Sequence, residues 1–220
     1  MSLLTMSAQL AEGFLITVEI FVLTLLFSLP LGLIVAFGRM SGCKVIRIIS
    51  KIYISIMRGT PLMLQIIVVY FAPFYVFRMQ VGTGYRFPAV ILAFVINYAA
   101  YFAEIYRAGV QSIDHGQHEA AKTLGFSRWQ TMRIIIIPQT IARVIPPVSN
   151  EVITLIKDTA LVTAIGVGEL LKAAKDANNR DVNPTAFFIA AVIYLALTFL
   201  LTLLSQWCEK RFSRHERKEA

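Results

Sequence analysis

Two carboxylates seven residues apart stand inside a stretch that is otherwise rich in Val, Ile and Leu. On an α-helix, Glu151 and Asp158 are separated by about 20° around the axis and by roughly 10 Å along it, so they share one face. Thr154 lies between them on that face. A charge at membrane depth is expensive and usually lines a pathway or pairs with another charge. We therefore predict that Glu151, Thr154 and Asp158 contact a substrate.

A matching polar stripe occurs about fifty residues earlier. Asn97, Tyr101 and Glu104 follow one another at i, i+4 and i+7, which places them within one narrow arc of a helix. Lys157 adds a cation beside Asp158, on the face next to the carboxylates. Helices with such polar faces cannot face lipid, so they line a water-filled cavity or a subunit interface.

A structural interpretation of these charges stays open beside substrate contact. Arg58, Glu104 and Arg107 can pair with one another as internal salt bridges or sit at the membrane interface. Lys157 can neutralise a neighbouring carboxylate without touching a substrate. The balance of charge favours substrate contact for Glu151 and Asp158, because only one lysine lies near the two carboxylates.

The elements that must position these residues are membrane helices. The chain is 57% hydrophobic with a mean hydropathy of +0.67, above the near-half apolar content of a soluble domain. A hydrocarbon core about 30 Å thick requires about 20 apolar residues in a helix. The sequence therefore predicts an all-α membrane protein that forms a single domain over residues 1–220. Its five predicted transmembrane helices are 13–38, 48–77, 87–110, 147–168 and 186–208.

The second of these spans contains the run Arg58-Gly59-Thr60-Pro61. Proline has no backbone N–H and clashes with the preceding turn, so Pro61 is expected to kink or interrupt the helix. The backbone groups freed there need partners from protein or water. Gln65 follows one turn later.

Basic residues predict the orientation, since cytoplasmic loops carry the excess of Lys and Arg. Arg39, Lys44, Arg47 and Lys51 surround the first connection, and five basic residues follow residue 209. We expect the N-terminus outside and the C-terminus inside, on the cytoplasmic side of the membrane. The formal net charge of +8 then reflects anionic lipids, and no nucleic-acid partner is predicted.

Residues 111–138, between the third and fourth predicted spans, form a polar loop that is expected to fold as two short helices. Asp114 caps the first helix and Gln117 occupies the reciprocal capping-box position. Ser127 and Gln130 form the same pair for the second helix. Gly125 suits the left-handed residue that ends the first helix, and Pro138 is expected to end the second. His115 and His118 have no further ligands nearby, so no metal site is predicted.

This loop reads EAAKTLGFSRWQTMRIIIIP over residues 119–138. It resembles the cytoplasmic EAA loop of bacterial ABC importer membrane subunits. The residues that carry the resemblance are Glu119, Ala120, Ala121, Gly125, Ile135 and Pro138, with Ile137 where that family usually has Leu. A DNA-binding helix-turn-helix shares the two-helix pattern but would require a soluble domain that the sequence does not show.

The resemblance implies a type I permease fold with a cytoplasmic coupling loop. It implies that Glu119, Ala120, Ala121 and Gly125 form the coupling helix that docks on a separate nucleotide-binding ATPase. No Gly-x-x-x-x-Gly-Lys-Ser/Thr loop occurs in the chain, so the chain is not expected to be an enzyme. ATP and Mg are expected on the ATPase, and no cofactor is expected on this chain.

Three further segments resemble the polar amino-acid branch of these importers, the histidine, arginine and glutamine type. They are Arg58–Pro61, Ala103–Gly109 and Leu155–Leu161. This resemblance implies a second permease subunit, identical or related, and an extracytoplasmic amino-acid-binding protein. By position, it places a mid-membrane substrate site at Asn97, Glu104, Glu151, Lys157 and Asp158.

The substrate residues indicate a polar L-amino acid, with a basic one favoured. Lys157 and Asn97 are predicted to bind the carboxylate of the amino acid and Asp158 its ammonium group, which leaves Glu151 for a cationic side chain. Glutamine, glutamate or cystine are the alternative cargoes. A stand-alone secondary transporter or channel is the alternative mechanism, although the sequence shows no clear inverted repeat.

Overall fold

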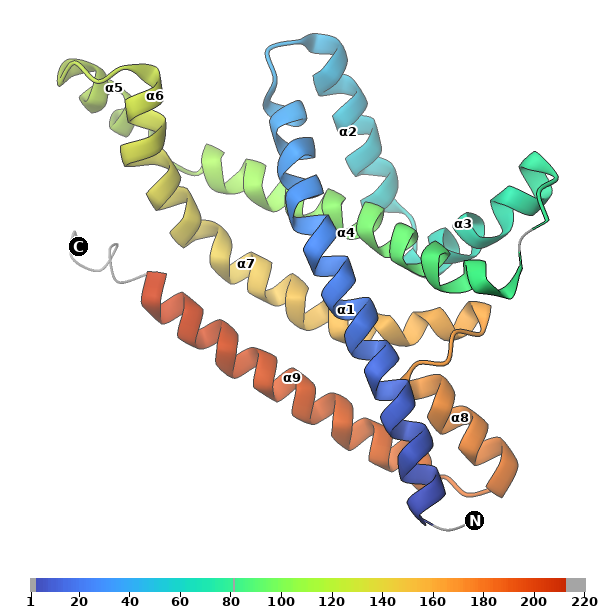
Figure 1. Cartoon of the computed structure of the whole chain (residues 1–220). Coiled ribbons are helices and arrows are strands. Elements are labelled where there is room, and N and C mark those ends of the chain that lie inside the picture. The colour runs from blue at the N-terminus through green and yellow to red at the C-terminus, as the bar shows by residue number, and fades with distance from the viewer. Residues whose placement is uncertain (1–2, 81, 213–220) are drawn as a thin grey trace.

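The computed structural model describes residues 3–80 and 82–212, and this part of the chain is helical throughout, without strands. Its long helices are α1 (Leu3–Met40), α4 (Arg86–Gln111), α7 (Ile137–Asp158) and α9 (Thr185–Phe212). The middle-sized helices are α2 (Lys44–Gly59), α3 (Leu62–Phe77) and α8 (Leu170–Asp181). Two short helices, α5 (His115–Thr123) and α6 (Arg128–Gln130), project at one end of the molecule (Figure 1).

Helix α4 is the centre of the packing. In its most apolar stretch 56% of the residues are buried, against 6% for α9. Phe94, Tyr98 and Phe102 of α4 are almost fully buried among side chains from α1, α3 and α7. Helix α9 instead exposes a run of large apolar side chains, Phe188, Val192, Leu195, Phe199 and Leu203, at helical spacing. This arrangement fits a helix that faces lipid.

Helix α1 crosses α4 at small residues. A Cβ added at Gly32 would stand 2.8 Å from Phe102 Cβ and 3.0 Å from the carbonyl oxygen of Ala99. Ala36, Ala100 and Ala103 are fully buried in the same contact. Small side chains let helix backbones approach closely, which is how membrane helices gain packing without a hydrophobic driving force.

The prediction that Pro61 interrupts the second span is confirmed. Helices α2 and α3 are bent by 109° at the Gly59–Leu62 break. With this bent pair taken as one span, up to four segments are long and apolar enough to cross a membrane in the described part of the chain. Helix α7 is not among them, because its polar residues lower its hydropathy. The count of five spans stays a prediction.

Two features of the fourth predicted span differ from expectation. Pro138 does not end a helix, because it follows directly on a π-helical segment, and such a local adjustment compensates for the missing N–H in a membrane helix. Helix α7 therefore starts at Ile137 instead of 147, and a π-helical segment, Thr131–Ile136, joins α6 to it without a break. The span also ends earlier as an α-helix, since Thr159–Ile165 forms a 3₁₀ helix that stops at Gly166 with φ 76°.

The arrangement separates two ends of the molecule (Figure 1). The α1–α2 turn lies at the top, the α5–α6 loop at the upper left and the end of α9 at the left, whereas the start of α1 and α8 lie toward the lower right and the α3–α4 connection lies at the right. The first group contains the connections that the sequence predicts to be cytoplasmic. In the second group, α8 packs on α1 and α9 through Leu170, Ala174 and Ala177.

Candidate functional site

The polar residues of α4 and α7 meet around one cavity of about 560 Å³, here called the central cavity. Five of the seven predicted substrate residues line it, namely Asn97, Tyr101, Glu151, Thr154 and Asp158. Residues from both predicted faces thus line one cavity, and their contact with a substrate stays a prediction. The α2–α3 break closes the cavity with Arg58, Gly59, Thr60, Pro61 and Leu62.

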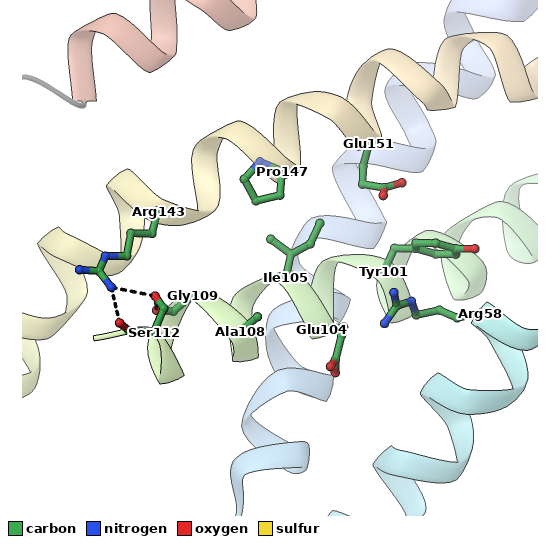
Figure 2. Close-up of a pocket in the computed structure, with 10 residues that line it drawn as sticks. All are labelled: Arg58, Tyr101, Glu104, Ile105, Ala108, Gly109, Ser112, Arg143, Pro147 and Glu151. Carbon is green, nitrogen blue, oxygen red and sulfur yellow. Dashed lines mark hydrogen bonds between the residues drawn. The ribbon is translucent and has the colours of Figure 1, made fainter. Parts of the chain in front are cut away.

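A second cavity of about 400 Å³ lies between α4 and α7, and it is called the α4–α7 cavity below. It shares Arg58, Tyr101 and Glu151 with the central cavity and extends to Ser112 and Arg143 (Figure 2). Since these last two residues lie beside the α4–α5 corner, the α4–α7 cavity lies on the side of the central cavity that is nearer to the α5–α6 loop.

The three charges of the central cavity differ in how far they are satisfied. Asp158 accepts a hydrogen bond from the Tyr98 hydroxyl, with 2.7 Å between Oη and Oδ2. Glu151 is half-buried and has no hydrogen bond or ion pair among the described residues. The Arg58 guanidinium lies over the Tyr101 ring at 5.3 Å from its centroid, a favourable cation–π distance. Arg58 likewise has no ion-pair partner within the described part of the chain.

Glu104 and Lys157 stand apart from this group. Glu104 lines the α4–α7 cavity, but both of its oxygens accept from Arg107, one of them at 3.0 Å. The salt-bridge alternative thus describes Glu104 and Arg107, and it does not extend to Arg58. Lys157 is exposed and lines neither cavity. Their roles toward a substrate stay predictions.

Asn97 lines the central cavity, but its amide hydrogens bond to other residues of the protein. Its Nδ2 donates to the Met57 carbonyl at 3.0 Å and to Gln65 Oε1 at 2.9 Å. Asn97 was predicted to donate a hydrogen bond to the carboxylate of a substrate. Its amide hydrogens are already used within the protein. Arg58 was missed as the cation of the site. The sequence signal that could have indicated Arg58 is its position three residues before Pro61. The helix break at Pro61 places Arg58 to Leu62 at the wall of the central cavity.

The loop of α5 and α6 confirms one of its two predicted capping boxes. Ser127 N donates to Gln130 Oε1 at 2.8 Å, and Gln130 N donates to Ser127 Oγ at 3.3 Å. The second predicted capping box, between Asp114 and Gln117, is not formed. Asp114 caps α5 by accepting from Gly116 N at 2.6 Å, and Gln117 instead accepts from Gln139 of α7 at 3.4 Å.

Gly125 ends α5 as predicted, with φ 80°. Phe126 N donates to Ala121 O and Gly125 N to Lys122 O, both at 3.0 Å, the pair of bonds that defines a Schellman motif. Glu119 and Ala120 are exposed, but Ala121 is fully buried. Glu119 and Ala120 are thus accessible to a partner, whereas Ala121 packs inside the loop, and the docking role of all three stays a prediction.

The exposed apolar side chains of this loop were missed. Leu124 is 74% exposed and Trp129 is 69% exposed, on either side of Gly125. Because both follow polar residues in the sequence, no periodic pattern marks them. His115 and His118 lie with ring centroids 6.2 Å apart, and no group of three metal-binding side chains occurs among the described residues.

Comparison with known proteins gives a consistent set of similarities. Residues 28–214 match the family model described as "Binding-protein-dependent transport system inner membrane component". The chain is 37% identical over 211 residues to the L-cystine transport system permease protein TcyB of Bacillus subtilis (strain 168), covering 95% of this chain and 88% of that protein. It is 35% identical over 206 residues to the arginine transport system permease protein ArtQ of the same organism, covering 93% of each.

Solved structures agree with these similarities. A chain of a crystal structure described as an amino acid ABC transporter with histidines superposes with a TM-score of 0.87 at 33% identity, covering 96% of this chain and 99% of the other. The MetNI methionine ABC transporter in an inward-facing form gives a TM-score of 0.75 at 20% identity, covering 97% of this chain and 100% of the other. The second likeness concerns the fold alone.

Proposed function

The chain belongs to the family of binding-protein-dependent transport system inner membrane components, and from this membership we propose which cargo it carries and how. It is a membrane permease subunit of an amino-acid ABC importer with the type I permease fold. Its family is not itself catalytic, and a partner ATPase hydrolyses ATP in such importers. The residues of the central cavity support a more specific proposal for the cargo, a basic L-amino acid.

The observation that carries this proposal is the set of unsatisfied charges in the central cavity. Among the described residues, Arg58 and Glu151 form no ion pair, although both line both cavities and the charge of Arg58 reaches Glu151, and Asp158 keeps one oxygen beyond the one bonded to Tyr98. A basic amino acid carries one carboxylate and two cationic groups. Arg58 would bind the carboxylate, Asp158 the α-ammonium group and Glu151 the charged end of the side chain.

The geometry changes one assignment made from the sequence. Arg58 replaces Lys157 and Asn97 as the partner of the cargo carboxylate, because Lys157 lies outside both cavities and the Asn97 donors are occupied. The cavity of about 560 Å³ lies in the range of roughly 300–1,000 Å³ that is usual for small-molecule sites.

The α4–α7 cavity lies between the central cavity and the α5–α6 loop, and this position supports alternating access driven from that loop. In this mechanism the ATPase docks on α5 through Glu119, Ala120 and Gly125, and its closure moves α7 relative to α4. An extracytoplasmic binding protein delivers the cargo at the opposite end, where α8 and the start of α1 lie (Figure 1). A second permease subunit, identical or related, completes the assembly, with the N-terminus outside and the C-terminus inside.

The test is uptake into proteoliposomes that contain the permease, its ATPase and its binding protein. Arginine, lysine and histidine should be taken up with a lower KM than glutamine, glutamate or cystine. Uptake should require ATP on the side of the membrane where the ATPase is bound. Preference for glutamine or cystine would overturn the basic cargo while leaving the importer intact. Transport by the purified chain without an ATPase would instead support the stand-alone transporter.

A further inference from the structure

The break between α2 and α3 leaves backbone carbonyls without their usual partners. In a continuous helix the Met57 carbonyl would accept a hydrogen bond from the N–H of residue 61, but Pro61 has no N–H. The Thr60 carbonyl is also free of a backbone bond, because Leu64 N donates to Pro61 O. Inside a membrane such groups must find partners within the protein.

Two side-chain amides supply these partners. Gln65 Nε2 donates to Met57 O at 2.9 Å, to Thr60 O at 3.1 Å and to Thr60 Oγ1 at 2.7 Å. Asn97 Nδ2 donates to the same Met57 carbonyl at 3.0 Å and to Gln65 Oε1 at 2.9 Å. The pair Gln65 and Asn97, called the amide clamp below, thus joins α2, α3 and α4 at one point.

The amide clamp is buried and its two members differ in their relation to the cavity. Asn97 is 3% exposed and Gln65 is 9% exposed. Asn97 lines the central cavity, whereas Gln65 lines neither cavity. Any effect of Gln65 on cargo must therefore pass through another residue.

That residue is Arg58. It lies between the two carbonyls that the clamp binds, those of Met57 and Thr60. Its guanidinium stands over Tyr101, which is one helical turn after Asn97 on α4. The clamp therefore holds both the backbone on each side of Arg58 and the helix against which its side chain rests.

We propose that Gln65 and Asn97 are positioning residues that fix Arg58 for recognition of the cargo carboxylate. This proposal rests on the proposed function, in which Arg58 binds that carboxylate. It assigns Asn97 to the clamp, where its two donors are used, instead of to direct binding of the cargo.

The test compares Gln65→Met, which keeps length and loses the amide, with Gln9→Met, a matched change near the start of α1 that also removes a hydrogen-bonded amide, here the acceptor of Arg180. In the assembled transporter, Gln65→Met should raise the uptake KM for arginine about tenfold, the effect of losing one to two hydrogen bonds. The preference for arginine over argininamide should fall by the same factor, because the amide lacks the carboxylate. Gln9→Met should change neither.

Two double variants separate positioning from other roles. Gln65→Met combined with Asn97→Ala should be no worse than the stronger single variant, since both break one clamp. Gln65→Met added to Arg58→Gln should have no further effect on the argininamide preference. Additive losses, or an unchanged preference in Gln65→Met, would overturn the proposal.

A second measurement does not depend on the cargo. With Cys43 and Cys208 replaced by serine, an Arg58→Cys thiol is modified with a cationic thiosulfonate reagent in the assembled transporter. Gln65→Met should change the modification rate several-fold if the clamp holds this segment, and an unchanged rate counts against it. If the rate changes but the protein carries no amino acid, the clamp stands and the proposed function falls.

Discussion

Tyr98 donates its hydroxyl hydrogen to Asp158 Oδ2 at 2.7 Å, and this bond joins the middle of α4 to the last residue of α7. The Tyr98 side chain is only 2% exposed and its ring stacks with Phe94. The hydroxyl therefore has a fixed position, and it orients the carboxylate so that the second oxygen remains for the central cavity.

Tyr98→Phe should weaken cargo binding without altering the fold. The phenylalanine keeps the ring packing but removes a hydrogen bond to a charged group, which contributes about 1.5–3 kcal/mol. We expect a rise of roughly tenfold or more in the uptake KM, with basal ATP hydrolysis unchanged. Uptake kinetics in proteoliposomes measure the effect. An unchanged KM would show that the orientation of Asp158 does not matter for binding.

Glu151→Gln should reduce selectivity for cationic cargo. The glutamine keeps the shape of the side chain but cannot neutralise a positive group, so the ratio of arginine to glutamine uptake should fall by about tenfold, the equivalent of about 1.4 kcal/mol. Competition between the two labelled amino acids gives this ratio directly. Thr154→Val is the control, because Thr154 lines the same cavity without charge and its hydroxyl bonds to Asn150 O. Equal ratios in wild type and Glu151→Gln would remove Glu151 from the site.

Arg143→Lys should loosen the link between ATP hydrolysis and transport. Arg143 of α7 donates to the backbone oxygen of Ser112 and, at 3.2 Å, to its hydroxyl (Figure 2). Ser112 ends α4 two residues before Asp114, which caps α5. Both bonds come from Nη1, and lysine keeps the charge but replaces the rigid guanidinium with a flexible ammonium group. We expect uptake per ATP hydrolysed to fall about tenfold while hydrolysis continues.

The control for this variant is Arg47→Lys on the exposed surface of α2. Coupling is measured as cargo accumulated against phosphate released in the same vesicles. If Arg143→Lys lowers both quantities equally, the residue supports stability and does not transmit movement.

Gly109→Ala should destabilise the crossing of α4 and α7. A Cβ at Gly109 would clash with Val144 Cγ1, and Val144 is itself 9% exposed in the contact. Overpacking of this kind destabilises by about 1–3 kcal/mol. Thermal unfolding in detergent should show a lower midpoint, and the added change Val144→Ala should restore most of it. A midpoint that Val144→Ala lowers further would mean that the helices do not meet there.

Gly125→Ala should weaken docking of the ATPase. The left-handed conformation at φ 80° costs a residue with a Cβ about 1–2 kcal/mol, although no atom lies within 4 Å of the added methyl group. We expect the affinity between permease and ATPase to fall about fivefold to tenfold. Gly42→Ala is the control, because its surroundings are equally open and its φ is not left-handed. Equal affinities of Gly125→Ala and Gly42→Ala for the ATPase would show that the left-handed turn at Gly125 does not contribute to docking.

The sequence predicted helix faces better than helix ends. The spacing of Glu151, Thr154 and Asp158 correctly placed three residues on one cavity, because side-chain direction follows from the helical repeat alone. Pro61 and Pro138 show why ends were harder. Each removes an N–H, but the π-helical segment before Pro138 compensates for that loss and the helix continues. The difference depends on the π-helical segment before it, which no local pattern marks.

The hydrogen-bond partners of individual side chains could not be predicted from the sequence. Asn97 lies on the predicted face, but its amide is committed to Met57 and Gln65. This commitment depends on the 109° bend, which brings α2 beside α4. Ala121 is similar, since its burial follows from the return of the chain at Gly125 and not from its own neighbours.

The π-helical segment Thr131–Ile136 has a consequence for how this protein can change in evolution. A π-helical turn contains one residue more than an α-helical turn. The π-helical turn takes up its extra residue locally, so loss of one residue from this segment would restore α-helical geometry and keep nearly the same rotational phase between α6 and α7. A single insertion within the α-helical part of α7 would instead rotate the α5–α6 loop by about 100° relative to the central cavity. The π-helical segment is therefore the place in this connection where the chain length can change by one residue with the least effect on the relative orientation of its two ends.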